Sequence, residues 1–200
     1  MGWLDTIRNA LRPATPAVVA FRPETSTLTP THETESARGE ERPQSAPANE
    51  RTYLPQDRHA ELLQPRPDGM PPLRLARHNG ALWLQEDTTG LLINVDNRYL
   101  PRLGIWGAKL RGHNHYDGKA ILGPAELVRE PDNPHDPNAV AVYAGGVMVG
   151  HYNKGMARRL AKLLDGGEPL VACFIEVDPP KVLAASQDII RYLYRGLPDP

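Results

Sequence analysis

The chain has 200 residues, a formal net charge of −1, 21 prolines and a single cysteine. Proteins that coat nucleic acid non-specifically need a large basic excess to neutralise many phosphates, so the near-neutral charge excludes that class. One cysteine excludes an intramolecular disulfide, and the place of Cys173 in the apolar run 170–175 predicts a buried thiol. No run approaches the ~20 apolar residues of a membrane-spanning helix. Residues 1–12 lack the apolar centre of a signal peptide, so we expect a cytoplasmic protein with no membrane partner.

Two segments precede the predicted folded region. In residues 1–12 the apolar side chains Trp3, Leu4, Ile7 and Leu11 recur at helical spacing before Pro13, which predicts a short amphipathic helix. Isolated helices shorter than ~12 to 15 residues are marginal, so we expect this one to dock on a protein partner. Residues 13–72 are rich in proline and poor in large apolar residues. They cannot bury enough apolar surface to offset an ordering cost of about 1 to 2 kcal/mol per residue, which predicts a disordered linker.

The pattern from Leu73 onward predicts short strands. Residues 73–77 alternate apolar and polar side chains, Asn79-Gly80 supplies a tight turn and residues 81–85 return, so 73–100 is predicted as a β-hairpin extension. Further strands are predicted within 102–110, 125–129, 139–143, 147–150 and 170–177. A strong amphipathic helix is predicted around 154–164 and a shorter one at 187–195. Residues 101–197 are therefore predicted to be one mainly β domain, a small barrel or sandwich with one or two short helices.

The most informative segment is the loop predicted between two strands at 129–140. Three prolines, at positions 131, 134 and 137, fix the backbone and remove donors. Short polar side chains between them can bond to neighbouring backbone amides, namely Asp132, Asn133, Asp136 and Asn138. The composition predicts a stiff loop that holds polar groups in fixed directions, and function often lies on such loops.

Three segments, in this order, resemble the HIRAN domain, the N-terminal module of fork-remodelling helicases that also occurs alone in bacteria and phages. The first is the glycine-bounded turn Gly112-His113-Asn114-His115-Tyr116-Asp117-Gly118. The second runs from Leu127-Val128-Arg129-Glu130-Pro131 to Asn138-Ala139-Val140-Ala141-Val142. The third is Val149-Gly150-His151-Tyr152-Asn153-Lys154, leading into a helix at Met156-Ala157. Three ordered matches over roughly 101–177 are more specific than any one of them.

The resemblance implies an OB-like β-barrel with a pocket for the 3′-terminal nucleotide of single-stranded DNA. Transferred by position, His115 and Tyr116 would stack on bases, and Asp136 would accept the terminal hydroxyl. His151 and Lys154 would meet the adjacent phosphate, and Asn133 would shape the pocket or contact a base edge. His115 and His135 stand where helicase members can carry tyrosine, which implies weaker stacking and an affinity that depends on pH near 6.5.

Each of these residues also has a structural interpretation. Tyr116 can be a half-buried strand tyrosine, and Asp136 can cap its own loop. The turn residues Arg129, Glu130, Pro131, Asn138 and Ala139 are better explained by the corner between two strands. Lys154, Arg158, Arg159 and Lys162 can form a solvated helix face.

Two other function classes are compatible with parts of the sequence. A metal-dependent hydrolase acting on nucleic acid could use His113, His115, His135 and His151 with Asp117 and Asp136 to hold zinc or another divalent ion. Their spacing fits no standard motif, and no phosphate-binding or nucleophile motif is present, so we expect no cofactor and no catalysis. A protein-interaction adaptor could use a barrel groove and the arm. The favoured hypothesis is a sensor of single-stranded DNA ends whose arm recruits a repair or replication partner.

Overall fold

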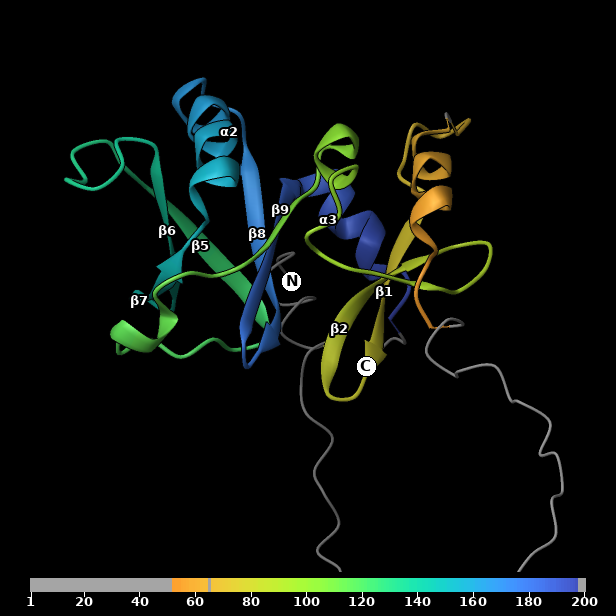
Figure 1. Cartoon of the computed structure of the whole chain (residues 1–200), viewed down its shortest axis with the longest axis horizontal. Helices are drawn as coiled ribbons and strands as arrows, with labels where there is room; N and C mark the ends of the chain where they lie inside the picture. The colour runs from red at the N-terminus through yellow and green to blue at the C-terminus, as the bar shows by residue number, and fades with distance from the viewer. Residues whose placement is uncertain (1–51, 65, 198–200) are drawn as a thin grey trace, which may run out of the picture.

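The computed structural model describes residues 52–64 and 66–197 (Figure 1). The predicted helix at 1–12 and the first part of the predicted linker lie outside this range. The elements, in chain order, are η2 (Gln56–Leu63), β1 (Leu73–His78), β2 (Ala81–Glu86), β3 (Leu92–Ile93), η3 (Leu100–Leu103), β4 (Trp106–Lys109), η4 (His113–His115), β5 (Gly123–Glu130), β6 (Ala139–Ala144), β7 (Val147–His151), α2 (Lys154–Asp165), β8 (Leu170–Val177), β9 (Pro180–Ser186) and α3 (Gln187–Tyr194). The predicted mainly β fold with two short α-helices is confirmed. None of the helices in the described ranges is long and apolar enough to cross a membrane.

A six-stranded antiparallel sheet forms the centre of the fold, in the order β4-β9-β8-β5-β6-β7. The sheet curls until its two edges meet beyond β4. There Arg111 and His151 exchange two backbone hydrogen bonds of 2.8 and 2.9 Å. This contact gives the barrel-like shape expected from the sequence, and it places the end of β7 beside the chain that leaves β4.

The second sheet, β1-β2-β3, is separate from the first. Its buried leucines Leu75 and Leu84 share a hydrophobic core with Cys173 and Ile175 of β8 and with Leu193 of α3. The hairpins at 73–100 therefore cover one face of the six-stranded sheet instead of extending it. The predicted burial of Cys173 is confirmed, and burial raises the pKa of its thiol to about 12.

The opposite face of the six-stranded sheet packs against α2. Phe174 and Val182 point into this second core, where they meet Val142 of β6 and Leu160 of α2. Successive residues of a strand point to opposite faces, so β8 alternates between the two cores, and both of its faces are apolar. The helix begins at Lys154, where the side chain of Asn153 accepts a hydrogen bond from the Met156 amide at 3.0 Å.

The described fold begins before the boundary predicted at Leu73. Leu54 and Leu62 are almost fully buried in the core of the three-stranded sheet, and the Leu54 amide donates to the Leu92 carbonyl at 2.9 Å. The predicted linker at 13–72 is therefore corrected for its last part. Its few apolar side chains do not form a core of their own. They fill a surface that distant strands provide, which local composition does not reveal.

Candidate functional site

The turn at η4 holds the Tyr116 side chain against the end of β7. Gly112 has a left-handed backbone (φ 72°), and a Cβ on it would lie 3.0 Å from Cε2 of Tyr116. The Tyr116 hydroxyl lies 3.2 Å from Nδ1 of His151, and the two ring centroids are 5.5 Å apart. Tyr116 is half-buried and its neighbour His115 is exposed. The turn thus presents part of a fixed aromatic ring to solvent.

His151 connects this tyrosine to the loop after β5. Its Nε2 lies 2.8 Å from Oε2 of Glu130, which also accepts a hydrogen bond of 2.8 Å from the Asn133 side chain. Burial acts to raise the pKa of the Glu130 carboxyl, but the hydrogen bonds from Asn133 and His151 and the charge of His151 outweigh it and hold the pKa below its ordinary value. Both ring nitrogens of His151 are engaged, so a phosphate contact by His151 would have to replace one of these bonds.

The proline-containing loop is braced by its own side chains, as predicted. Oδ1 of Asn133 accepts from the amides of His135 and Asp136 at 2.9 and 3.3 Å. Oδ1 of Asp136 accepts from the amide and the side chain of Asn138 at 2.9 and 3.2 Å. Both polar atoms of the Asn133 side chain are used within this region, which favours a shaping role over a contact with a base. His135 is exposed on the same loop.

Asp136 lies beside the first turn of α2. Hydrogen bonds from Asn138 are the main cause of the lowered pKa of its carboxyl, and the charges of Lys154 and Arg158 lower it further. Within the described ranges, no hydrogen bond reaches Oδ2 of this carboxylate. Asp136 therefore caps its loop with one oxygen and keeps the other as an acceptor, next to two exposed cations.

Arg129 has the structural role that its position suggested. It donates to the carbonyl of Ala139 at 2.9 Å and forms two hydrogen bonds of 2.9 and 3.1 Å with the Asp165 carboxylate. These contacts fix the base of the loop to the end of α2.

Glu130 is also predicted to be structural, and in the fold it supports the candidate site by linking His151 to Asn133. A charged residue at a strand end gives no sequence signal for such a link.

Five of the seven predicted site residues form two adjacent clusters, and the exposed side chains of His115 and His135 belong to neither. Tyr116 lines a cavity of about 390 Å³ together with Asn114, Lys119 and Pro180, among others, and Asp136, His151 and Lys154 do not line it. Tyr116, His151 and Asn133 belong to one hydrogen-bonded row, whereas Asp136 and Lys154 belong to the second cluster. The two clusters meet where the Asp136 amide bonds to Asn133.

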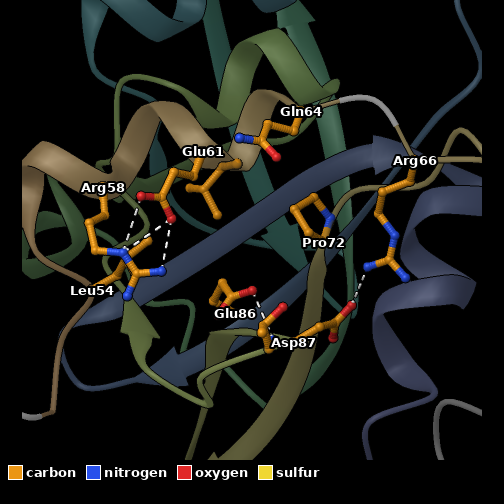
Figure 2. Close-up of a pocket in the computed structure, with 10 residues that line it drawn as sticks. Leu54, Arg58, Glu61, Gln64, Arg66, Pro72, Glu86 and Asp87 are labelled. Atoms are coloured by element: carbon orange, nitrogen blue, oxygen red, sulfur yellow. Dashed lines mark hydrogen bonds and ion pairs between the residues drawn. The ribbon is translucent and has the colours of Figure 1, made fainter.

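A further cavity, of about 410 Å³, lies between η2 and the turn after β2 (Figure 2). Its charged side chains neutralise one another, because Arg58 pairs with Glu61 and Arg66 pairs with Asp87, each at 2.8 Å. Glu86 accepts three hydrogen bonds from Thr88 and Thr89. These polar groups brace the fold and leave little free charge for a ligand.

The histidines that the sequence offers as zinc ligands do not lie together as a metal site in the described part of the chain. Among the described residues, no group of three or more histidine, cysteine, aspartate or glutamate side chains is placed to hold a metal ion. His151 is instead committed to Tyr116 and Glu130.

Comparison with known proteins finds a family match in the part of the chain that carries these clusters. Residues 102–190 match the family model described as the HIRAN domain. Among solved structures, the crystal structure of the HIRAN domain of human HLTF is similar, with 23% sequence identity and a TM-score of 0.38. That match covers 47% of this chain and 86% of the other. No curated protein matches the chain significantly.

Proposed function

We propose that residues 102–190, the part of the chain that matches the HIRAN domain family model, form a DNA-binding module that binds the 3′ end of single-stranded DNA. The observation that carries the proposal is the row Tyr116, His151, Glu130 and Asn133. It ties a half-buried aromatic ring, part of which faces solvent, to the loop that bears Asp136. A rigid link of this kind sets the distance between a surface that stacks bases and a hydroxyl acceptor before DNA arrives, which lowers the ordering cost of binding.

Each chemical feature of a strand end has a counterpart in the two clusters. The terminal hydroxyl donates to Oδ2 of Asp136, and the adjacent phosphate meets the Lys154 ammonium. The Tyr116 ring, with His115 beside it, stacks on a base, a contact of about 1 to 3 kcal/mol that tolerates any sequence. His151 and Glu130 position Tyr116 and touch no DNA in this scheme.

The overall charge fits recognition of an end better than coating of a strand. With a net charge of −1, the chain can make only a few localised phosphate contacts, so its affinity should depend weakly on salt. A module of this kind suits DNA repair or replication, where exposed ends need to be found, and residues 1–12 would recruit the protein that acts on them.

The test is fluorescence anisotropy with matched 5′-labelled oligonucleotides of about 12 nucleotides, with a free or a phosphate-blocked 3′ hydroxyl, and with the same free end in a blunt duplex. We expect the free single-stranded end to bind most tightly. Asp136→Asn keeps the Oδ1 acceptor for Asn138 and replaces Oδ2 by a donor, so it should abolish the preference for the free hydroxyl while lowering Tm only slightly, through the lost charge beside Lys154 and Arg158. Asp132→Asn, in the same loop and exposed, is the matched control. Equal binding of free and blocked ends by the parent protein would refute the proposal.

A further inference from the structure

Three arginines from two distant parts of the chain line one cavity. Arg98 and Arg102 lie in the segment between β3 and β4, and Arg159 lies on α2. Together with Tyr99 they line a cavity of about 430 Å³, and all three arginine side chains are exposed. In Figure 1 this place lies where α2 faces the short green helical turn η3.

These three arginines differ from four arginines elsewhere in the described chain that are ion-paired. Arg58, Arg66, Arg129 and Arg195 each pair with a carboxylate at 2.7 to 2.9 Å. Within the described ranges, no carboxylate lies within the 4.0 Å ion-pair distance of Arg98, Arg102 or Arg159. Asp96 lines a neighbouring cavity with Arg98 and Tyr99 but is not in ion-pair contact with either arginine of this segment. Three like charges around one cavity repel, and an anion bound between them would offset that repulsion.

Tyr99 holds two of the guanidinium groups in place. The Cζ atoms of Arg98 and Arg102 lie 5.0 and 5.5 Å from its ring centroid, and Arg98 donates a hydrogen bond of 3.1 Å to its hydroxyl. The Tyr99 amide donates a hydrogen bond of 2.9 Å to Oδ1 of Asn97. The Tyr99 ring also makes an edge contact with the His59 ring, and the two ring centroids lie 6.4 Å apart. Arg98 and Arg102 are thus preorganised, and η2 supports the tyrosine that orders them.

We infer that this cavity binds a phosphate group of the DNA strand whose 3′ end lies at Asp136. The inference rests on the proposed function. Arg158 faces Asp136, and the next residue, Arg159, points about 100° further round α2 into the arginine cavity. In this scheme, a strand that leaves the end site across the exposed surface of α2 passes from Arg158 to Arg159. Guanidinium groups suit this ligand because their planar donors match two phosphate oxygens at once.

The experiment measures binding of 5′-labelled oligothymidylates of about 3 and about 12 nucleotides by anisotropy, at salt concentrations from about 50 to 200 mM. Arg102→Ala and Arg159→Ala should each weaken binding of the long oligonucleotide about fivefold and leave the short one unchanged. The slope of log affinity against log salt, which is negative, should become less negative by about 0.7 for each phosphate that a variant no longer neutralises. Arg102→Lys, which retains the charge, should keep most of that slope. Arg191→Ala, exposed on α3 and outside this cavity, is the charge-matched control.

The outcomes separate this inference from the proposed function. If neither arginine variant changes the affinity or the salt slope of the long oligonucleotide, the inference is overturned, whatever the end preference. If blocked and free ends bind equally but the variants still weaken binding of the long oligonucleotide, the proposed function fails and the phosphate site at the arginines stands.

Competition with inorganic phosphate and thymidine monophosphate tests the source of the phosphate. Variants that lose only mononucleotide binding would assign the cavity to a free nucleotide and overturn its role in binding the strand.

Discussion

The Tyr116 hydroxyl lies 3.2 Å from Nδ1 of His151, although the two residues are 35 positions apart in the chain. His151 ends β7, and its backbone also closes the curled sheet by bonding to Arg111. When the imidazole is neutral and protonated on Nε2, that nitrogen donates to Glu130, so Nδ1 accepts from the Tyr116 hydroxyl. The orientation of the half-buried Tyr116 ring is therefore set by the same residue that joins the two sheet edges.

Substitution of Glu130 by alanine should weaken DNA binding about three- to tenfold, although this residue does not contact DNA in the proposed scheme. The change leaves Nε2 of His151 and Nδ2 of Asn133 without their shared acceptor, so both the Tyr116 ring and the loop lose their support. Anisotropy titration measures the effect. Glu130→Gln, which keeps an acceptor oxygen, should restore most of the affinity, and Glu126→Ala, exposed on the same strand, should have none of the effect. Unchanged binding by Glu130→Ala would show that the row does not position Tyr116.

Removal of the Tyr116 ring should reduce the free energy of binding by about 1 to 3 kcal/mol, the usual range for stacking of a base on an aromatic side chain. Tyr116→Phe retains the ring and loses only the hydroxyl bond to His151, so its affinity should lie between those of the parent and of Tyr116→Ala. Titration of all three proteins with the same oligonucleotide tests this order. An alanine variant that binds as tightly as the parent would favour the interpretation of Tyr116 as an ordinary half-buried tyrosine.

The stability that Glu130 contributes should be lost in acid. Its pKa in the fold lies below the ordinary value of 4.5, because the bonds from Asn133 and His151 outweigh the opposing effect of burial. The ionised carboxylate therefore stabilises the fold above that ordinary value, and the contribution disappears as the pH falls through the lower folded value. Urea denaturation should show Glu130→Gln less stable than the parent by about 1 kcal/mol near pH 6, with a smaller difference near pH 3. A difference that stays constant between these pH values would contradict the assignment.

Truncation of a buried side chain in η2 should show that this segment belongs to the fold. Leu62 is 1% exposed in the core of the three-stranded sheet, so Leu62→Ala should lower the free energy of unfolding by about 2 to 4 kcal/mol. Glu61→Ala, which removes an exposed ion pair in the same turn, should change stability little. If both variants unfold at the same urea concentration as the parent, the segment is a linker, as its composition alone suggests.

Local patterns in the sequence determined the mainly β fold, the helix at 154–164 and the braced loop at 131–138. Each of these depends on side chains that are close in the chain. Alternation places the residues of a strand on two faces, and prolines and short polar residues shape a turn wherever the turn lies. The ordered segments around Tyr116, Asp136 and His151 also carried the family resemblance, so the region of the candidate site could be predicted.

Only the tertiary structure decided which of these residues touch one another. The link from His151 to Glu130 spans 21 positions, and it exists because β5 and β7 both flank β6 and bring their ends together. The packing of Leu62 on distant strands and the cavity that Arg159 and Arg102 both line arise in the same way. Strand order and register set such contacts, and they depend on the balance of packing over the whole core, whereas periodicity reports only which face of its own element a residue occupies.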